Sequence, residues 1–257
     1  MEQFINFNPI LQAFICTFFT YSITALGASV VFFFKKVNQK FMDALMGFSA
    51  GVMIAASFWS LLEPAIELCS EINMHPSFCA LGLFIGGMFI VLSDVVMQHF
   101  TKIEDKRKRQ ILLFSSVTLH NIPEGMAVGV AFGGLALNIS GITIWSALSI
   151  ALGIGIQNFP EGACISLPMR RDGYSRRKAF FYGQLSAIVE PIAGIMGVLF
   201  VFAVKSVLPI LLSFSAGAMI AVVCSELIPE AFKDNKFIAS IGVIFGFITM
   251  MLLDVLL

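Results

Sequence analysis

The sequence predicts an all-α polytopic membrane protein with eight transmembrane helices. Of its 257 residues, 58% are hydrophobic and only 12% are charged, and the mean hydropathy is +0.91. Soluble domains carry about 25% charged residues, so this composition excludes an ordinary water-soluble fold. The chain divides into apolar runs that each approach the ~20 residues of a membrane-spanning helix. Because these runs use almost the whole chain, we expect one transmembrane domain over residues 1–257 and no separate soluble domain.

The expected helices follow one another through short connections. In chain order they cover residues 9–34, 41–62, 78–98, 110–132, 142–166, 179–203, 209–230 and 237–257. The first run has no basic segment before it and no clear small-residue cleavage site, so it is predicted to be a retained helix rather than a signal peptide. No basic patch with interleaved aromatic residues indicates a nucleic-acid partner.

Basic residues predict the orientation of these helices. Fifteen of the sixteen Lys and Arg residues fall in the connections between helices 1 and 2, 3 and 4, 5 and 6, and 7 and 8, and only Lys205 falls elsewhere. Short basic loops stay in the cytoplasm, so both termini are expected outside a plasma (inner) membrane. Glu63, Glu67 and Glu71 then lie at the outer end of helix 2 and in the loop after it. They form either an acidic rim that concentrates cations or a solvated loop face.

An internal repeat relates the first three helices to the last three. Residues 48–55 read FSAGVMIA and residues 214–221 read FSAGAMIA, identical at seven of eight positions. In helices 3 and 8, Gly82, Gly86 and Asp94 recur 160 residues later as Gly242, Gly246 and Asp254. An odd number of helices separates the two units, so the second is inverted, in a 3+2+3 arrangement around helices 4 and 5. Inverted repeats are typical of transporters; shared small-residue packing motifs would not also repeat Phe, Met and Ile.

A second repeat carries the chemistry. Residues 120–125 read HNIPEG and residues 157–162 read QNFPEG, each inside an apolar run. On a helix, His120 and Asn121 share a face with Glu124, and Gln157 and Asn158 share a face with Glu161. Pro123 and Pro160 each lack a backbone donor, which predicts a kinked, interrupted helix at a buried site or a cavity.

These motifs favour a site for a metal cation. Glu190, beside Pro191 on helix 6, adds a third carboxylate within the membrane. Imidazole and carboxylate together suit divalent zinc, iron and manganese, and two ions could share Glu124 and Glu161 as bridging ligands. No Lys or Arg lies within these helices to neutralise the acids. The alternative is a set of protonated carboxyls that hydrogen-bond the helices together, although acids in a membrane are rarely kept for packing alone.

The two motifs and the eight helices resemble the ZIP family of zinc and iron transporters, and within it the GufA-like and ZupT-like branch. The resemblance covers the whole chain and implies a binuclear metal centre between helices 4, 5 and 6. It implies one site made of His120, Glu124, Gln157 and Glu161. It implies a second site made of Asn121, Glu124, Asn158, Glu161 and Glu190.

Other features come from the resemblance alone. Many relatives have His or Asp where this chain has Gln157 and Asn158, which leaves the choice among zinc, iron, manganese, cobalt and cadmium open, with zinc expected first. Met53, with Ser60 and Glu67 farther along helix 2, matches a pathway position. The resemblance also implies a homodimer in which the metal-bearing helices slide against the others.

Two rival functions remain at this stage. A metal-dependent intramembrane enzyme would need a zinc ligand set with a nearby general base, such as HExxH, and the sequence has no such motif. A purely structural membrane scaffold would leave the two PEG motifs unexplained. We therefore expect no catalytic residues and no cofactor apart from the transported metal.

The five cysteines show no CxxC spacing, so a thiolate zinc site is not expected. Cys69 and Cys79 flank one loop. They could pair if that loop faces an oxidising compartment, or remain two free thiols.

Overall fold

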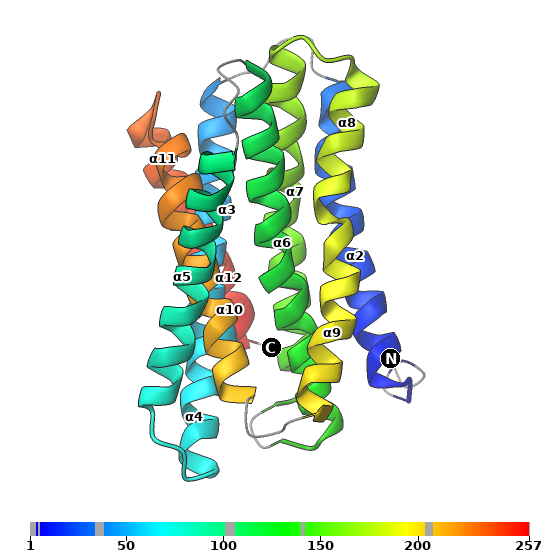
Figure 1. Cartoon of the computed structure of the whole chain (residues 1–257), viewed down its shortest axis with the longest axis vertical. Helices are drawn as coiled ribbons and strands as arrows, with labels where there is room; N and C mark the ends of the chain where they lie inside the picture. Colours follow the sequence, from blue (N-terminus) through cyan, green and yellow to red (C-terminus); the bar gives the residue numbers. More distant parts are fainter. Residues whose placement is uncertain are drawn as a thin grey trace.

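The computed structural model describes residues 4, 6–33, 39–100, 106–139, 142–203 and 208–256, and gives the backbone alone at 71, 97–100, 106–113, 116 and 120. All regular structure in these ranges is helical, and consecutive helices join end to end into rods that run along one bundle (Figure 1). Six rods are long and apolar enough to cross a membrane. The other two, α6 and α7, contain the polar motifs, which lower their hydropathy. The chain is therefore an all-α polytopic membrane protein.

The helical elements have the following bounds. They are α2 Pro9–Ser29 with the 3-10 turn Val30–Phe32, α3 Gln39–Ala56, the π-helical segment η2 Ser57–Leu62, α4 Glu63–Glu71, α5 Ser77–Phe100, α6 Lys106–Ala136, α7 Ile144–Arg171, α8 Arg176–Leu185, the 3-10 turn η3 Ser186–Ile188, α9 Val189–Ala203, α10 Leu208–Val222, the π-helical segment η5 Val223–Leu227, α11 Ile228–Ala231 and α12 Lys236–Leu256.

Local sequence explains where helices begin. Asn8 caps α2 by accepting a hydrogen bond from the Ile10 amide at 2.9 Å, and Pro9 stands at the first helical position, where its missing donor costs nothing. At α7, Thr143 and Ser146 cap each other's backbone amides in a capping box. Ser175 accepts from the Lys178 amide at the start of α8.

The second rod is longer than predicted. The predicted helix ends at residue 62, with Glu63, Glu67 and Glu71 at its outer end and in the loop after it, but helical backbone continues through η2 and α4 to Glu71. Pro64 lies in the first turn of α4, where a proline is tolerated. The same pattern of a π segment followed by a proline recurs at η5 and Pro229. These two π segments occupy the same place in the two copies of the sequence repeat.

The prediction of interrupted helices at the two PEG motifs was wrong. Pro123 and Pro160 lie inside α6 and α7, and both helices continue through them without a break. Backbone irregularity lies instead in η2, in η5 and in the 3-10 turn η3, which immediately precedes α9 and its Glu190-Pro191 pair.

Within the described residues, the rods pack as two groups of four. The most extensive contacts join α3 to α12 and α5 to α10 in one group, and α2 to α7 and α6 to α9 in the other. Figure 1 shows the first group on the left and the second in the centre and on the right, with α6 and α7 at their boundary. Each group thus takes helices from both ends of the chain, so the 3+2+3 order along the sequence is not the division in space.

Close glycine contacts follow the repeat. A Cβ on Gly86 of α5 would lie 1.9 Å from the carbonyl oxygen of Phe214, and a Cβ on its repeat equivalent, Gly246 of α12, would lie 2.0 Å from that of Phe48. Phe48 and Phe214 are themselves equivalent, so the same helix contact occurs twice. Only glycine fits at such an approach.

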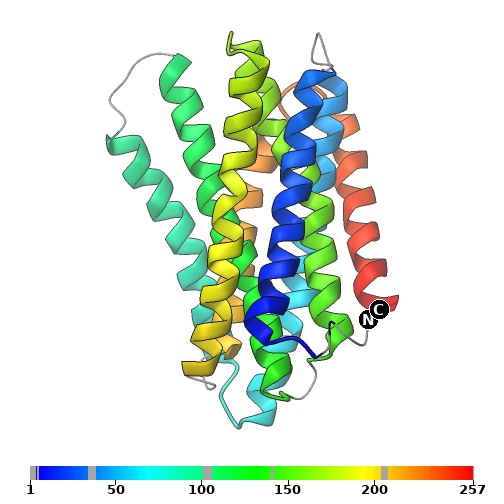
Figure 2. The ribbon, with the colours of Figure 1, turned by 90° about the vertical axis from the view of Figure 1, so that its right-hand side faces the viewer.

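Different helix ends and turns lie at the two ends of the bundle. The start of α2, the end of α12 and the turn between α4 and α5 lie at the lower end in Figures 1 and 2. The start of α3, the turn between α7 and α8, and the α11 end lie at the upper end (Figure 1). The Lys and Arg residues with described side chains belong to these segments and to the start of α12. The helices α5 and α12 are the least buried spans, and their outer faces carry exposed apolar side chains such as Phe84 and Phe245.

Candidate functional site

The predicted site residues lie at the midpoints of three rods. Glu124 and Gln157 stand near the centres of α6 and α7, and Glu190 stands at the start of α9, halfway along the α8–η3–α9 rod. All the described site side chains are buried, and Glu161, at 7% exposure, is the least so. The bundle therefore holds these polar groups at mid-depth, far from both ends.

Hydrogen bonds join the three rods at this point. The Nε2 atom of Gln157 donates to Oε1 of Glu124 at 2.5 Å, which links α7 to α6. The Nδ2 atom of Asn158 donates to Oε1 of Glu190 at 3.0 Å, which links α7 to α9. The structure thus brings together one carboxylate and one amide at each of two adjacent positions.

Two equivalent amides also hold the backbones of neighbouring rods. Asn121 donates through Nδ2 to the carbonyl oxygen of Ser186 at 3.1 Å. Asn158 donates through Nδ2 to the carbonyl oxygen of Thr20 at 3.3 Å. Both pairs occupy equivalent places in the repeats, since Asn121 corresponds to Asn158 and Thr20 to Ser186. The amide nitrogens are thereby used for positioning, which leaves the amide oxygens for other partners.

Five of these side chains present a buried oxygen without a hydrogen-bond partner. These oxygens are Asn121 Oδ1, Glu124 Oε2, Gln157 Oε1, Asn158 Oδ1 and Glu161 Oε1. Buried polar atoms in proteins are nearly always paired, and leaving one unpaired costs about 1–3 kcal/mol. All five atoms are acceptors, so the group that complements them is a cation or a proton donor.

The carboxyls are close enough to repel one another. Glu124 interacts electrostatically with Glu161 and Glu190, and Glu190 interacts with Glu161. The sequence has no Lys or Arg between residues 110 and 169 or between 179 and 204 that could neutralise them. Among the described side chains, no cluster of three or more His, Cys, Asp or Glu residues could hold a metal ion by itself. The unpartnered oxygens of the site come from amides as well as from carboxylates.

One predicted ligand and one unpredicted neighbour complete the description of the site. His120 lies on α6 one turn before Glu124, but its side chain is outside the described part of the chain. Thr20 of α2 was not predicted. Its hydroxyl has two acceptors in reach for its one hydrogen, Oε2 of Glu190 and the carbonyl oxygen of Thr17 at 2.9 Å. Thr20 is equivalent to Ser186 in the repeat, but this equivalence alone does not indicate a contact with Glu190.

The predicted pathway residues lie along the second rod. Met53 is buried in α3, whereas Glu67 of α4 is exposed. Ser60, in η2, donates to both carboxylate oxygens of Asp254 at 2.8 Å, and Ser149 of α7 donates to Oδ1 of Asp254 at 3.1 Å. The sequence indicates Asp254 only as the counterpart of Asp94 in the repeat. Through these bonds it joins the two helical groups below the site.

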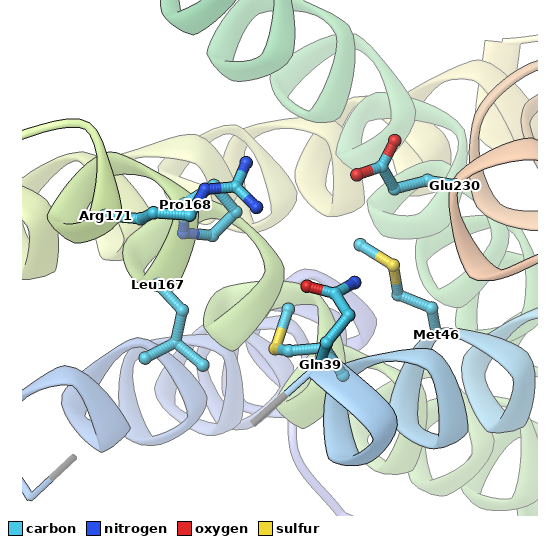
Figure 3. Close-up of a pocket in the computed structure, with 7 residues that line it drawn as sticks. Gln39, Met46, Leu167, Pro168, Arg171 and Glu230 are labelled. Carbon is cyan, nitrogen blue, oxygen red and sulfur yellow. The ribbon is translucent and has the colours of Figure 1, made fainter. Parts of the chain in front are cut away.

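A pocket opens at the other end of the bundle. Figure 3 shows it between the start of α3, the end of α7 and α11. Its lining residues are Gln39, Met42, Met46, Leu167, Pro168, Arg171 and Glu230. Leu167 follows Glu161 by six residues, or about 9 Å along the helix axis. The pocket therefore lies on the upper side of the site, where the basic residues gather.

Comparison with known proteins agrees with this architecture. Residues 97–254 match the family model described as "ZIP Zinc transporter". The chain is 38% identical to "Zinc transporter ZIP11" of Xenopus tropicalis over 97% of this chain and 98% of the relative. It is 32% identical to "Zinc transporter GufA" of Myxococcus xanthus over 90% and 93% of the two chains. It is 30% identical to "Zinc transporter ZupT" of Clostridium perfringens over 95% of both. The chain therefore belongs to the ZIP family of metal transporters.

Proposed function

We propose that this protein carries divalent transition-metal ions across the membrane into the cytoplasm, with zinc as its main substrate. The observation that carries the proposal is the group of five unpartnered, buried acceptor oxygens among three carboxyls. A divalent cation satisfies those oxygens and neutralises the acids, whereas burying the ionised acids without a counter-charge costs several kcal/mol per group. The relatives' names agree with zinc, and carboxylate and amide oxygens also accept iron and manganese.

Two ions bind side by side in the proposed site. Glu124 and Glu161 bridge them, with His120 and Gln157 completing one ligand set and Asn121, Asn158 and Glu190 completing the other. The pairing of Glu124 with Gln157, and of Glu190 with Asn158, supports this division. Apart from His120, every proposed ligand offers an oxygen donor. Oxygen donors are harder than the sulfur and nitrogen donors of thiolate or multi-histidine zinc sites.

The metal enters from the lower end and leaves at the upper end. Ser60, with Asp254 beside it, and Met53 lie along the entry route, and the exposed Glu67 precedes them. The gathering of basic residues at the upper end supports its placement in the cytoplasm. The rods then cross the membrane eight times, with both termini outside and the second repeat inverted.

Alternating access follows from the two groups of helices. The group of α2, α6, α7 and α9 carries every proposed ligand, and the group of α3, α5, α10 and α12 carries Met53 and Asp254. Sliding the first group against the second moves the site from one side of the membrane to the other. We expect the second group, with its exposed apolar faces, to hold two copies together as a homodimer.

Uptake into reconstituted vesicles tests this proposal. Purified protein in vesicles should accumulate radiolabelled zinc above protein-free vesicles, and unlabelled iron and manganese should compete less strongly than unlabelled zinc. Accumulation of labelled zinc equal to that of protein-free vesicles refutes zinc transport. Stronger competition by manganese or iron than by zinc refutes the substrate preference and leaves transport intact.

A further inference from the structure

Two buried thiols meet at the lower end of the bundle, away from the metal site. Cys69 lies in the last turn of α4 and Cys79 in the first turn of α5, on either side of the α4–α5 turn. Their Sγ atoms are 3.1 Å apart, and both residues are buried, with 0% and 2% exposure. A disulfide has a sulfur–sulfur distance of ~2.05 Å, so a small side-chain rotation brings the two atoms to bonding distance.

The turn itself holds the thiols in place. The Met74 amide donates to the carbonyl oxygen of Cys69 at 2.8 Å, and the Cys79 amide donates to that of Pro76 at 3.0 Å. Asn73 adopts a φ of 54°, a left-handed conformation that asparagine tolerates in turns. The backbone therefore presents the two side chains to each other before any covalent bond forms.

The repeat supplies an internal comparison. The turn between α11 and α12 is the equivalent of the α4–α5 turn and lies at the opposite end of the bundle. Residues 228–240, which make up α11, that turn and the start of α12, contain no cysteine. Of these two turns, the one on the proposed outer side has a cysteine on each flank. Oxidising compartments are where protein disulfides persist.

We propose that Cys69 and Cys79 are oxidised to a disulfide that ties α4 to α5 at the extracytoplasmic face. The inference rests on the orientation given under the proposed function. The oxidant is a dithiol–disulfide exchange protein of that compartment. While the chain folds and the pair is still accessible, one thiolate attacks the oxidant's disulfide to form a mixed disulfide, and the other thiolate displaces the oxidant. The pair loses two electrons and two protons, and the oxidant's disulfide becomes a dithiol.

The proposed disulfide would restrain the α3–η2–α4 rod, whose helix is irregular. The α3–η2–α4 rod changes its hydrogen-bond pattern at the π segment η2, just before α4. The disulfide fixes the far end of that rod to α5, which packs along α10. It also closes a short loop, which restricts the unfolded chain and stabilises the fold.

Thiol trapping tests the disulfide without reference to transport. Membranes are treated with N-ethylmaleimide in denaturant without reductant, and the peptides are analysed by mass spectrometry. Cys16, Cys164 and Cys224 should carry the label, and Cys69 and Cys79 should appear as one linked peptide that separates on reduction. Labelling of both Cys69 and Cys79 before reduction overturns the proposal.

A chelator treatment and a melting-temperature measurement distinguish a Cys69–Cys79 disulfide from other reasons why these thiols do not react with the label. If a chelator without reductant makes Cys69 and Cys79 reactive, a bound metal rather than a disulfide protects them, and the proposal is wrong. Reductant should lower the apparent melting temperature of the wild type by several degrees and leave Cys69→Ser/Cys79→Ser unchanged. Cys224→Ser, the control, should respond to reductant as the wild type does; equal responses of all three proteins overturn the proposal. Each of these readouts is independent of metal uptake.

Discussion

Thr20 shows how a residue outside the two motifs supports the acidic site. Its hydroxyl donates to Oε2 of Glu190, while its backbone carbonyl accepts from Asn158. Glu190 thereby uses one oxygen for Thr20 and the other for Asn158. Nothing in the local sequence around Thr20 indicates this role, because a threonine in a membrane helix commonly bonds its own backbone.

Replacing this hydroxyl should weaken metal binding without removing a ligand. Partners that orient metal ligands typically contribute 10- to 100-fold in metal affinity or activity, so Thr20→Val should raise the zinc concentration for half-maximal uptake by roughly 10-fold or more. Thr249→Val is the matched control, since the Thr249 hydroxyl on α12 donates to the carbonyl oxygen of Phe245 on the same helix. Equal concentration dependence in the two variants would show that Thr20 does not position Glu190.

Gln157 is the position where the donor set can be made softer. Its Nε2 atom already bonds Glu124, and its Oε1 atom has no partner. Gln157→His adds an imidazole and should raise the ratio of zinc to manganese uptake. The two rates are compared in wild type and variant at equal expression. A ratio that stays the same or falls would mean that Gln157 does not contact the metal that determines selectivity.

At the scale of helices, glycine determines how closely the outer helices approach. Gly86 and Gly87 are neighbours on α5, but a Cβ on Gly86 would lie 1.9 Å from Phe214 O, whereas one on Gly87 would lie 3.4 Å from Gly217 O. The first distance is impossible without moving the helices, and the second is ordinary contact.

The two alanine variants should therefore differ in stability. Overpacking a close contact typically costs about 1–3 kcal/mol, so Gly86→Ala should lower the apparent melting temperature in detergent. Gly87→Ala should stay near wild type, or gain slightly because alanine favours helix. Equal melting temperatures for the two would contradict the close packing of α5 on α10.

The helices were the most predictable elements, because long apolar runs between charged connections leave few alternatives. Their irregularities were not predictable. Pro123 and Pro160 suggested breaks, yet α6 and α7 continue through them, and the π segments η2 and η5 occur where nothing but a following proline indicates them. The end of the second rod was missed for a related reason, since Glu63-Pro64 begins a new helical turn instead of ending the helix.

At the scale of the whole molecule, contacts between distant segments determine the site. The motifs indicated Asn121, Glu124, Gln157, Asn158, Glu161 and Glu190, because polar residues at helical spacing inside apolar runs need a common partner. The contributions of Thr20 and Asp254 depend on which rods become neighbours, and so does the division into two groups of four. The sequence repeat predicts equivalence between rods but not their contacts.

The proposed orientation predicts opposite accessibility for the two ends. Arg177, at the start of α8, and Ala136, at the end of α6, are both exposed. In a Cys224→Ser background, a membrane-impermeant thiol reagent added outside intact cells should label Ala136→Cys and leave Arg177→Cys unlabelled until the membrane is opened. Labelling of Arg177→Cys alone in intact cells would mean that the orientation is reversed. Labelling of both cysteines would refute the eight-crossing arrangement.

Glu124 and Glu161 test the central claim most directly, because each is proposed to contribute charge to both metal positions. The measurement is zinc uptake by vesicles containing Glu124→Gln or Glu161→Gln, variants that keep the side-chain shape and remove the charge. Asp234→Asn, in the exposed connection between α11 and α12, is the control for loss of one carboxylate. We expect both glutamine variants to fold and to fall to the uptake of protein-free vesicles, while Asp234→Asn transports as the wild type does. Near-normal zinc uptake by a folded Glu124→Gln or Glu161→Gln protein would contradict the account.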